Sequence, residues 1–294
     1  MDSLSILIPV YNWDCSQLIK DLHYQGLVLG IPYEIIVADD CSTDSELREK
    51  SRIAAETHEN CRYFGLQHNI GRAAIRNFMA DQSKYDRLLF LDCDSAVKDH
   101  DFLMKYVDAA DAASVICGGV IHPDEIPQKG VELRYLYEKS ASFERSAGFR
   151  SKNPYLRFTS FSFLIDKSVF MSIRFDESYV GYGYEDVQFG HELEKNSVSI
   201  LHIDNPLSHL GLENSEAYLN KTRQAVINAF EHKDEIGESS KLLNNYNRVL
   251  KYRMRWVFRF IWTFFQKSME RNLLGPKPKL RVFSLYKLCY ICLL

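Results

Sequence analysis

Short apolar runs alternate with stretches of helical spacing through residues 1–112 of the chain. The apolar or β-branched runs, which predict β-strands, cover 3–10, 33–39, 61–66 and 87–91. The stretches between or after them, whose apolar residues recur at helical spacing, cover 15–27, 43–57, 70–83 and 100–112. Strands that alternate with helices form βαβ units, in which the strands lie parallel and helices cover the sheet. We therefore predict an α/β fold with a Rossmann-like sheet flanked by helices.

Three later apolar runs extend this sheet. They cover 114–120, 159–165 and 197–203, and we expect the middle one to be an antiparallel addition. The result would be a mixed, mostly parallel sheet of about six to eight strands. In open α/β sheets the functional crevice lies beyond the carboxyl ends of the strands. The loops that follow those strands are therefore the places to search for chemistry.

The composition is that of a folded globular protein, because 46% of the 294 residues are hydrophobic and 26% are charged. The seven cysteines form no pair of CxxC motifs, which argues against a disulfide framework or a zinc module and favours a reducing compartment. The N-terminus lacks a basic region and reads as a first strand, so we expect a cytosolic start. No stretch reaches about 18 uninterrupted apolar residues, since the best candidate, 256–265, contains Arg259.

The net charge of −3 is the sum of a negative N-terminal part of the chain and a positive C-terminal part. Residues 246–294 contain 11 Lys and Arg and a single acid, Glu270, so this tail carries +10 and the preceding residues carry −13. The sign changes within the polar stretch 232–247. We therefore predict one domain over 1–231, and a linker with a basic, aromatic-rich helical tail over 232–294.

The tail has the pattern of a helix that lies in the plane of an anionic membrane surface. Four basic residues follow one another at steps of three, four and four, which predicts one basic side of a helix beside an aromatic-rich face. They are Arg248, Lys251, Arg255 and Arg259. Phosphate headgroups attract such cations while aromatic rings enter the acyl boundary. The sequence GPKP at 275–278 then breaks the helix before a second basic and apolar segment.

Other partners are also considered for this tail. It could be an ordinary C-terminal helix that packs on the domain, or it could form a homodimer contact. Nucleic acid is disfavoured as a partner, because the larger part of the chain is acidic.

Two acids directly follow the apolar run at 87–91. In extended backbone Asp92 and Asp94 would point the same way and Cys93 would point oppositely, toward the core. Adjacent carboxylates are costly unless a cation lies between them, and hard oxygen donors favour Mg²⁺ or Mn²⁺ over zinc. The same pattern also occurs in solvated acidic turns and at helix caps. A divalent metal site is the functional interpretation.

A second acidic cluster, residues 39–44, lies where a strand turns into a helix. Asp44 or Ser42 would cap that helix. Asp39 and Asp40 are surplus to capping and could accept hydrogen bonds from a base or from ribose hydroxyls, as acids do at strand ends in nucleotide sites.

Five segments of the chain carry a family resemblance. They are ILIPVYN (6–12), EIIVADDCSTD (34–44), NIGRAAIRN (69–77), LFLDCDS (89–95) and GYGYEDVQFGHEL (181–193). Their order and separations resemble those of the nucleotide-sugar-binding motifs of inverting family-2 glycosyltransferases of GT-A fold, over about residues 3–212. GYGYED also resembles a C-terminal motif of galactosyltransferases and N-acetylgalactosaminyltransferases. DCST stands where DGST is commoner, and Ala74-Ile75 stand where small residues are usual, which leaves the donor sugar open.

The resemblance implies roles in donor binding for the earlier segments. Pro9 and Tyr11 would border the nucleobase pocket. Asp39 or Asp40 would hold the base and ribose, and Arg76 would help to shape the donor site.

Metal-binding and catalytic roles are implied for the later segments. Asp92 and Asp94 would bind ribose and a diphosphate bridged by Mn²⁺ or Mg²⁺, and His209 would complete the metal shell. Asp186 would be the catalytic base, and Glu185 would contact a sugar hydroxyl. A lone histidine is more often structural, and an acid at a helix N-terminus can serve only the helix dipole.

The resulting hypothesis is a metal-dependent, inverting glycosyltransferase. It would move a hexose or N-acetylhexosamine from a UDP-sugar to a glycan or lipid-linked saccharide in surface-polysaccharide or lipopolysaccharide assembly. We expect a cytoplasmic protein that is peripheral on the cytoplasmic face of the membrane.

Two other classes compete with this hypothesis. The run LFLDCDSAV also resembles the start of haloacid-dehalogenase-type phosphatases, but Ala96 and the fourth position of the strand are unusual for them. A catalytically silent nucleotide-binding module on a membrane is the other alternative.

Overall fold

Two compact units make up the chain, and each draws on separate stretches of sequence. The computed structural model describes the backbone of residues 1–294 and every side chain except that of Glu238. The first unit comprises 1–122, 143–178 and 189–211, and the second unit comprises 123–142, 179–188 and 212–294. The domain boundary expected between residues 231 and 232 stays a prediction.

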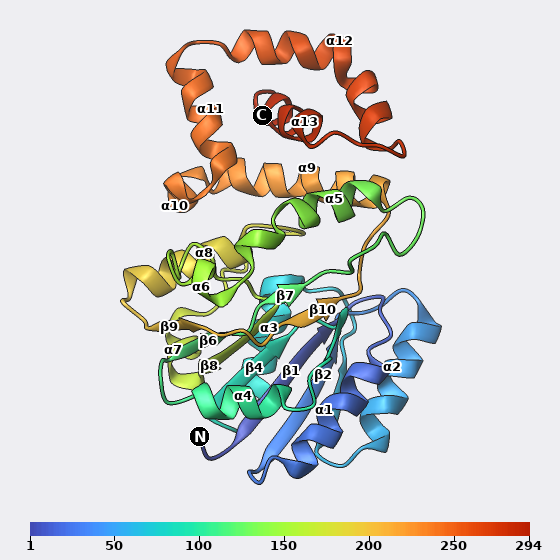
Figure 1. Ribbon diagram of the computed structural model, residues 1–294, viewed down its shortest axis with the longest axis vertical. Helices are drawn as coiled ribbons and strands as arrows, with labels where there is room; N and C mark the ends of the chain where they lie inside the picture. The colour runs from blue at the N-terminus through green and yellow to red at the C-terminus, as the bar shows by residue number, and fades with distance from the viewer. The chain divides into compact units, whose positions relative to one another are not determined.

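A seven-stranded sheet of order β3-β2-β1-β4-β8-β6-β9 forms the centre of the first unit (Figure 1). Its strands are β1 (Leu4–Val10), β2 (Tyr33–Asp39), β3 (Cys61–Gly65), β4 (Arg87–Leu91), β6 (Val115–Cys117), β8 (Ser162–Asp166) and β9 (Ile200–His202). β8 runs antiparallel to β4 and β6, and the other pairs are parallel. The predicted mixed, mostly parallel sheet and its antiparallel addition are therefore confirmed.

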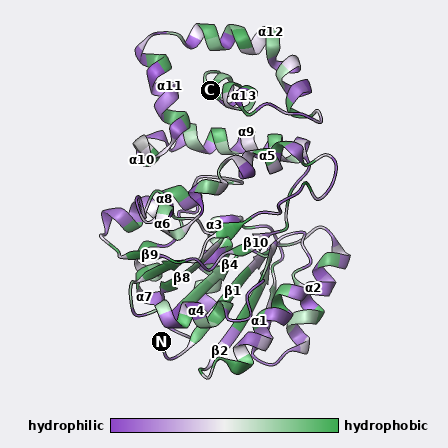
Figure 2. Cartoon of the chain, viewed as in Figure 1, coloured by the Kyte–Doolittle hydropathy of each residue, from purple (hydrophilic) through white to green (hydrophobic). Residues whose placement is uncertain are grey.

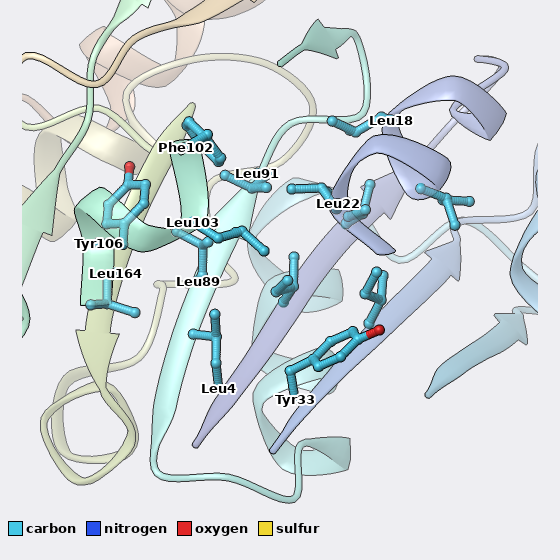
Figure 3. Packing of buried hydrophobic residues seen from close by; sticks show 14 of the residues in the cluster. Leu4, Leu18, Leu22, Tyr33, Leu89, Leu91, Phe102, Leu103, Tyr106 and Leu164 are labelled. Atoms are coloured by element: carbon cyan, nitrogen blue, oxygen red, sulfur yellow. The ribbon is translucent and has the colours of Figure 1, made fainter. Parts of the chain in front are cut away.

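Alternating side chains of the sheet account for a hydrophobic core on each of its faces. Ile6 and Ile8 of β1 pack on one face with α1 (Ser16–Val28) and α4 (Phe102–Ala109), as Figure 3 shows for Leu4 and Leu22. Leu7 belongs to the opposite core, with α3 (Arg72–Gln82) and α7 (Lys167–Ile173). Because both faces are covered, the strands are hydrophobic along their length (Figure 2). The other helices of this unit are α2 (Ser45–Thr57), α6 (Ala147–Arg150) and the part of α8 (Glu185–Lys195) from residue 189 onward.

A second, smaller sheet of order β5-β10-β7 also belongs to the first unit. It consists of β5 (Ser95–Ala96), β10 (Leu207–His209) and β7 (Val120–Ile121). β10 pairs antiparallel with β5 and parallel with β7. Strands of two or three residues show no periodicity, so the sequence did not predict β5 or β10.

The second unit is helical, and its last helix lies among the others (Figure 1). Its helices are α5 (Glu132–Ser140), α9 (Ser215–Glu231), α10 (Lys233–Ile236), α11 (Lys241–Lys251), α12 (Arg255–Leu273) and α13 (Leu280–Ile291), with a short 3-10 turn over Gly237–Ser239. A second 3-10 turn, Ser142–Glu144, has only its first residue in this unit. α13 contacts α9, α11 and α12, and it buries Phe283, Tyr286 and Cys289. The second basic and apolar segment is therefore a core helix of this unit.

The predicted single basic helix over 248–259 is wrong. The chain leaves the helical path after α11, where Arg253 has a left-handed φ of 55° and Met254 N donates to Val249 O at 2.9 Å. Moreover, Arg255 Nε and Arg259 Nε each donate to Cys292 O at 2.9 Å. These two guanidiniums satisfy a carbonyl at the C-terminal end of α13 instead of lining one face with Arg248.

Two other expectations about the tail hold. Residues 275–278 do separate α12 from α13. Among the described residues, no helix is both long enough and apolar enough to span a bilayer.

The left-handed backbone of Arg253, two residues after α11 ends, yields a stability prediction. A left-handed residue costs free energy unless it is glycine, so Arg253→Gly should raise the free energy of unfolding by about 0.5–1 kcal/mol. Urea denaturation measures this value, with Arg253→Ala as the control that removes the same charge without relieving the backbone. An Arg253→Gly protein no more stable than Arg253→Ala would contradict this account of the helix end.

Candidate active site

The loops that follow β1 and β2 are joined by a network around Asp39. Asp39 is fully buried and accepts from Ser42 N at 2.8 Å and Ser42 Oγ at 2.6 Å. Ser42 Oγ in turn accepts from Asn12 N at 2.8 Å. Asp44 caps α2, accepting from the backbone N–H groups of residues 46 and 47, as predicted for one member of this cluster. Asp39 therefore shapes the loop between β2 and α2 and links it to the loop after β1.

Asp40 fixes the start of α3. Its carboxylate accepts from Ile70 N at 2.7 Å and from Gly71 N at 3.0 Å. Gly71 has φ 89°, a conformation that favours glycine, and it precedes the first residue of α3. Burial raises the pKa of the Asp40 carboxyl, and the two backbone donors oppose this rise. Asp40 thereby ties the end of β2 to the segment NIGR.

Pro9 and Tyr11 lie at the carboxyl end of β1. Pro9 is partly buried within the strand, and the Tyr11 side chain is 49% exposed. In the register of β1 and β2, Pro9 pairs with Ala38, and Val10, which lies between Pro9 and Tyr11, pairs with Asp39. Both residues therefore lie at the end of β1, and their place at the border of a nucleobase pocket stays a prediction.

Asp92 is held by arginines of α3. Arg76 is 1% exposed, and its Nη2 donates to Asp92 Oδ1 at 2.6 Å while its Nη1 donates to Arg72 O at 2.9 Å. Arg72 Nη2 lies 3.4 Å from Asp92 Oδ2. A charge-assisted bond to a buried guanidinium fixes the orientation of Asp92. Arg72 was missed in the sequence, although it lies one turn before Arg76 in the same segment.

Asp94 is paired with His209. β5 begins directly after Asp94, and the antiparallel register pairs His209 with Ser95. Leu210 N donates to Asp94 O at 2.8 Å, and His209 Nε2 lies 3.2 Å from Asp94 Oδ2. His209 is buried. The small sheet therefore brings together two predicted site residues that are 115 positions apart in the chain.

The expected extended backbone from Asp92 to Asp94 is wrong. Residues 93 and 94 form a turn, so Asp92 and Asp94 bind different partners, the arginines of α3 and His209 respectively. Cys93 does pack against the hydrophobic core, as expected, and burial raises the pKa of its thiol. Cys93 is therefore no candidate nucleophile.

His122 is a candidate site residue that the sequence analysis missed. It follows β7, whose parallel register pairs Leu207 with Val120 and Ser208 with Ile121, so His209 comes next to His122. The two imidazole rings meet edge to face with centroids 5.4 Å apart. The signal in the sequence is a histidine directly after the apolar pair Val120 and Ile121.

Glu185 and Asp186 belong to the second unit, where they begin α8 (Glu185–Lys195) as predicted. Glu185 is buried and accepts from Gly183 N at 3.0 Å, and Asp186 Oδ1 accepts from Val187 N at 2.8 Å. The preceding loop is attached to α9, because Asn228 Nδ2 donates to the carbonyl of Gly183 at 3.1 Å. Their roles as base and acceptor contact stay predictions.

The first unit has the mixed sheet of an α/β protein with acids at the ends of its strands, and comparisons with known proteins give the family. The family model described as glycosyl transferase family 2 matches residues 5–177. The chain therefore belongs to this family and is a glycosyltransferase with the GT-A fold. These comparisons give no support to the phosphatase or to the silent binding module. No curated protein matches significantly.

Several solved structures share the fold. S. aureus TarS 1-349, solved in complex with UDP-GlcNAc, is 18% identical with a TM-score of 0.52, and the match covers 99% of this chain and 90% of that one. Mannosyltransferase PcManGT from Pyrobaculum calidifontis, with GDP-Man and Mn²⁺, is 14% identical with a TM-score of 0.56, covering 98% and 85%. Glucosyl-3-phosphoglycerate synthase from Mycobacterium tuberculosis, with Mn²⁺, UDP and glucosyl-3-phosphoglycerate, is 15% identical with a TM-score of 0.54, covering 78% and 79%.

The packing around Asp94 yields a second prediction. A Cβ on Gly211 would lie 2.1 Å from Asp94 Oδ2 and 2.8 Å from Asp94 Cβ, so Gly211→Ala must displace the carboxylate. Such overpacking should lower the free energy of unfolding by about 1–3 kcal/mol, measured in urea. Gly148→Ala is the matched control, because nothing lies within 4 Å of a Cβ there. Equal stability of the two variants would show that Asp94 is not held against Gly211.

Proposed function

We propose that the protein is a metal-dependent, inverting glycosyltransferase that transfers a hexose or N-acetylhexosamine from a UDP-sugar to a glycan acceptor. The observation that carries the proposal is the Asp94 and His209 pair, 3.2 Å apart at their side-chain tips, in a member of glycosyl transferase family 2. A lipid-linked saccharide in surface-polysaccharide or lipopolysaccharide assembly is the acceptor class we favour.

The two ligand atoms of this pair, a carboxylate oxygen and an imidazole nitrogen, suit a divalent cation. Adjacent ligands of an octahedral ion with bonds of about 2.1 Å lie about 3 Å apart, close to the separation of Asp94 Oδ2 and His209 Nε2. Mn²⁺ or Mg²⁺ held there would neutralise the charge that develops on a nucleoside diphosphate leaving group. The structures of the mannosyltransferase and the synthase, which were solved with Mn²⁺, support this assignment.

The other acids of the first unit would shape the donor pocket. Asp92, oriented by Arg76, would accept from the ribose hydroxyls. Asp39 and Asp40 bind backbone N–H groups and would keep the loops that contact the base in place. The exposed ring of Tyr11 is available to border the base together with Pro9.

Asp186 is the base we propose for the acceptor hydroxyl. Inversion needs one group that removes the acceptor proton while oxygen attacks the anomeric carbon from the face opposite the diphosphate. The first turn of α8 favours the ionised form of Asp186, since the positive end of a helix stabilises an anion. Glu185 would contact an acceptor or donor hydroxyl, in line with the resemblance of GYGYED to galactosyl- and N-acetylgalactosaminyltransferases.

Mutation of the two acids tests this proposal. Asp186→Asn should keep Mn²⁺-dependent UDP binding, measured by calorimetry, and lose transfer by about 10²–10⁴-fold, because only the base is removed. Asp94→Ala should weaken Mn²⁺-dependent UDP binding itself. Glu194→Gln is the control, since it neutralises an exposed acid on the same helix. Normal turnover by Asp186→Asn would reject the assigned base.

The cytoplasmic face of a membrane is the location we propose, with an aromatic ridge of α12 as the contact. The ridge comprises Trp256, Phe260 and Phe264, whose side chains are 70%, 55% and 66% exposed. They are spaced by four residues, so they share one side of the helix, and Lys267 and Arg271 continue that side as exposed cations. Exposed rings followed by cations, in a tail of charge +10, match an anionic lipid surface.

Vesicle binding tests the ridge. The protein should sediment with phosphatidylglycerol vesicles but much less with phosphatidylcholine vesicles, and Trp256→Ser/Phe260→Ser/Phe264→Ser should reduce binding at least tenfold. Leu27→Ser/Val28→Ser is the control, because these residues are 59% and 76% exposed on α1. Vesicle binding unaffected by the triple variant would refute the ridge. The ridge would also be refuted if the wild-type protein bound no vesicles and light scattering showed a wild-type dimer that the triple variant converts to a monomer.

A further inference from the structure

We propose that His122 is a third ligand of the cation held by Asp94 and His209, and that it makes the site prefer Mn²⁺ over Mg²⁺. The inference rests on the metal site of the proposed function and deepens it. It assigns a role to a residue that the five sequence segments do not contain.

The strand register places His122 beside the other two ligands. β10 lies between β5 and β7, so Asp94, which precedes β5, and His122, which follows β7, flank the strand that ends with His209. Asn205 N donates to Gly118 O at 3.2 Å and Leu207 N donates to Gly119 O at 3.3 Å, which joins the two chain segments before β7 and β10 pair. All three residues belong to the first unit.

A buried arginine and two glycines hold this arrangement in place. Arg150 is 5% exposed, and it donates to the carbonyls of Cys117, Gly118 and Ile203. A Cβ on Gly118 would lie 2.3 Å from the Tyr106 hydroxyl, and Gly119 has φ 100°. The glycines before β7 are therefore required by close packing and by backbone conformation, and they deliver His122 to a fixed position.

His209 lies close to each of the other two proposed ligands. The ligand atoms of His122 and His209 lie within 4.8 Å of each other, and His209 Nε2 is 3.2 Å from Asp94 Oδ2. Around an octahedral ion with bonds of about 2.1 Å, ligands lie between about 3 Å and about 4.2 Å apart. Phe161 packs edge to face on His209 and limits the approach of water from that side.

The donor chemistry decides which cation the site prefers. Mg²⁺ binds oxygen ligands and keeps several waters, whereas imidazole suits borderline transition-metal ions. A set of one carboxylate and one imidazole is compatible with either ion. A second imidazole occupies a coordination position that an oxygen ligand would otherwise fill. This lowers the affinity for Mg²⁺ more than the affinity for Mn²⁺. His122 is therefore the residue that would determine the selectivity.

Metal titration of the full chain tests the inference without any measurement of transfer. Free Mn²⁺ is followed by electron paramagnetic resonance in the presence of UDP, and Mg²⁺ affinity is obtained by competition. His122→Asn should lower Mn²⁺ affinity about tenfold or more and Mg²⁺ affinity much less. His122→Asp should restore binding with the preference moved toward Mg²⁺. His191→Asn, an exposed histidine of the first unit, is the control.

The outcomes separate this inference from the proposed function. If Asp94→Ala abolishes Mn²⁺ binding but His122→Asn keeps the wild-type ratio of Mn²⁺ to Mg²⁺ affinity, the inference about His122 is wrong and the metal site stands. If Asp94→Ala leaves Mn²⁺ binding unchanged, the metal site of the proposed function fails, and the inference fails with it.

A measurement on the unmutated protein covers the case in which a variant does not fold. Electron spin echo modulation of bound Mn²⁺ counts coordinated imidazoles through their nitrogen couplings. Two coordinated imidazoles are expected, and a single one would overturn the proposal.

Discussion

The pairing of β5 with β10 is the interaction on which the rest of the site depends. β5 and β10 are short, yet their antiparallel ladder and the bond from Leu210 N to Asp94 O tie the loop after β4 to a segment far along the chain. Gly211 leaves room for the Asp94 carboxylate, which a Cβ would meet at 2.1 Å. Without this ladder, nothing in the sequence order would bring a carboxylate and an imidazole to one point.

The acids at the strand ends divide into separate roles because each has different donors. Asp39 and Asp40 are buried and bind backbone N–H groups, so they give the loops their shape. Asp92 faces a buried guanidinium, whose hydrogen bond fixes the orientation of its carboxylate. Asp94 instead faces His209. A neutral imidazole and a carboxylate can both bind a cation, whereas a carboxylate already paired with arginine is less suited to do so.

Features with a local cause could be predicted from the sequence, and features with a non-local cause could not. Apolar runs predicted β2 and β4, so the positions of Asp39 and Asp92 at strand ends followed. The turn after Asp92 could not be predicted, because pairing with β10 imposes it. The register that brings His122 to His209 is equally non-local. The basic stripe of the tail failed for the same reason, since Arg255 bonds to the end of α13.

The most direct test of the account is the position of a bound ion. Crystals grown with Mn²⁺ and UDP should give an anomalous scattering peak, measured at the manganese edge, within bonding distance of Asp94 Oδ2 and His209 Nε2. The diphosphate should complete its coordination. A peak bonded to neither side chain, with UDP bound at the carboxyl ends of the strands, would contradict the claim that this pair holds the ion.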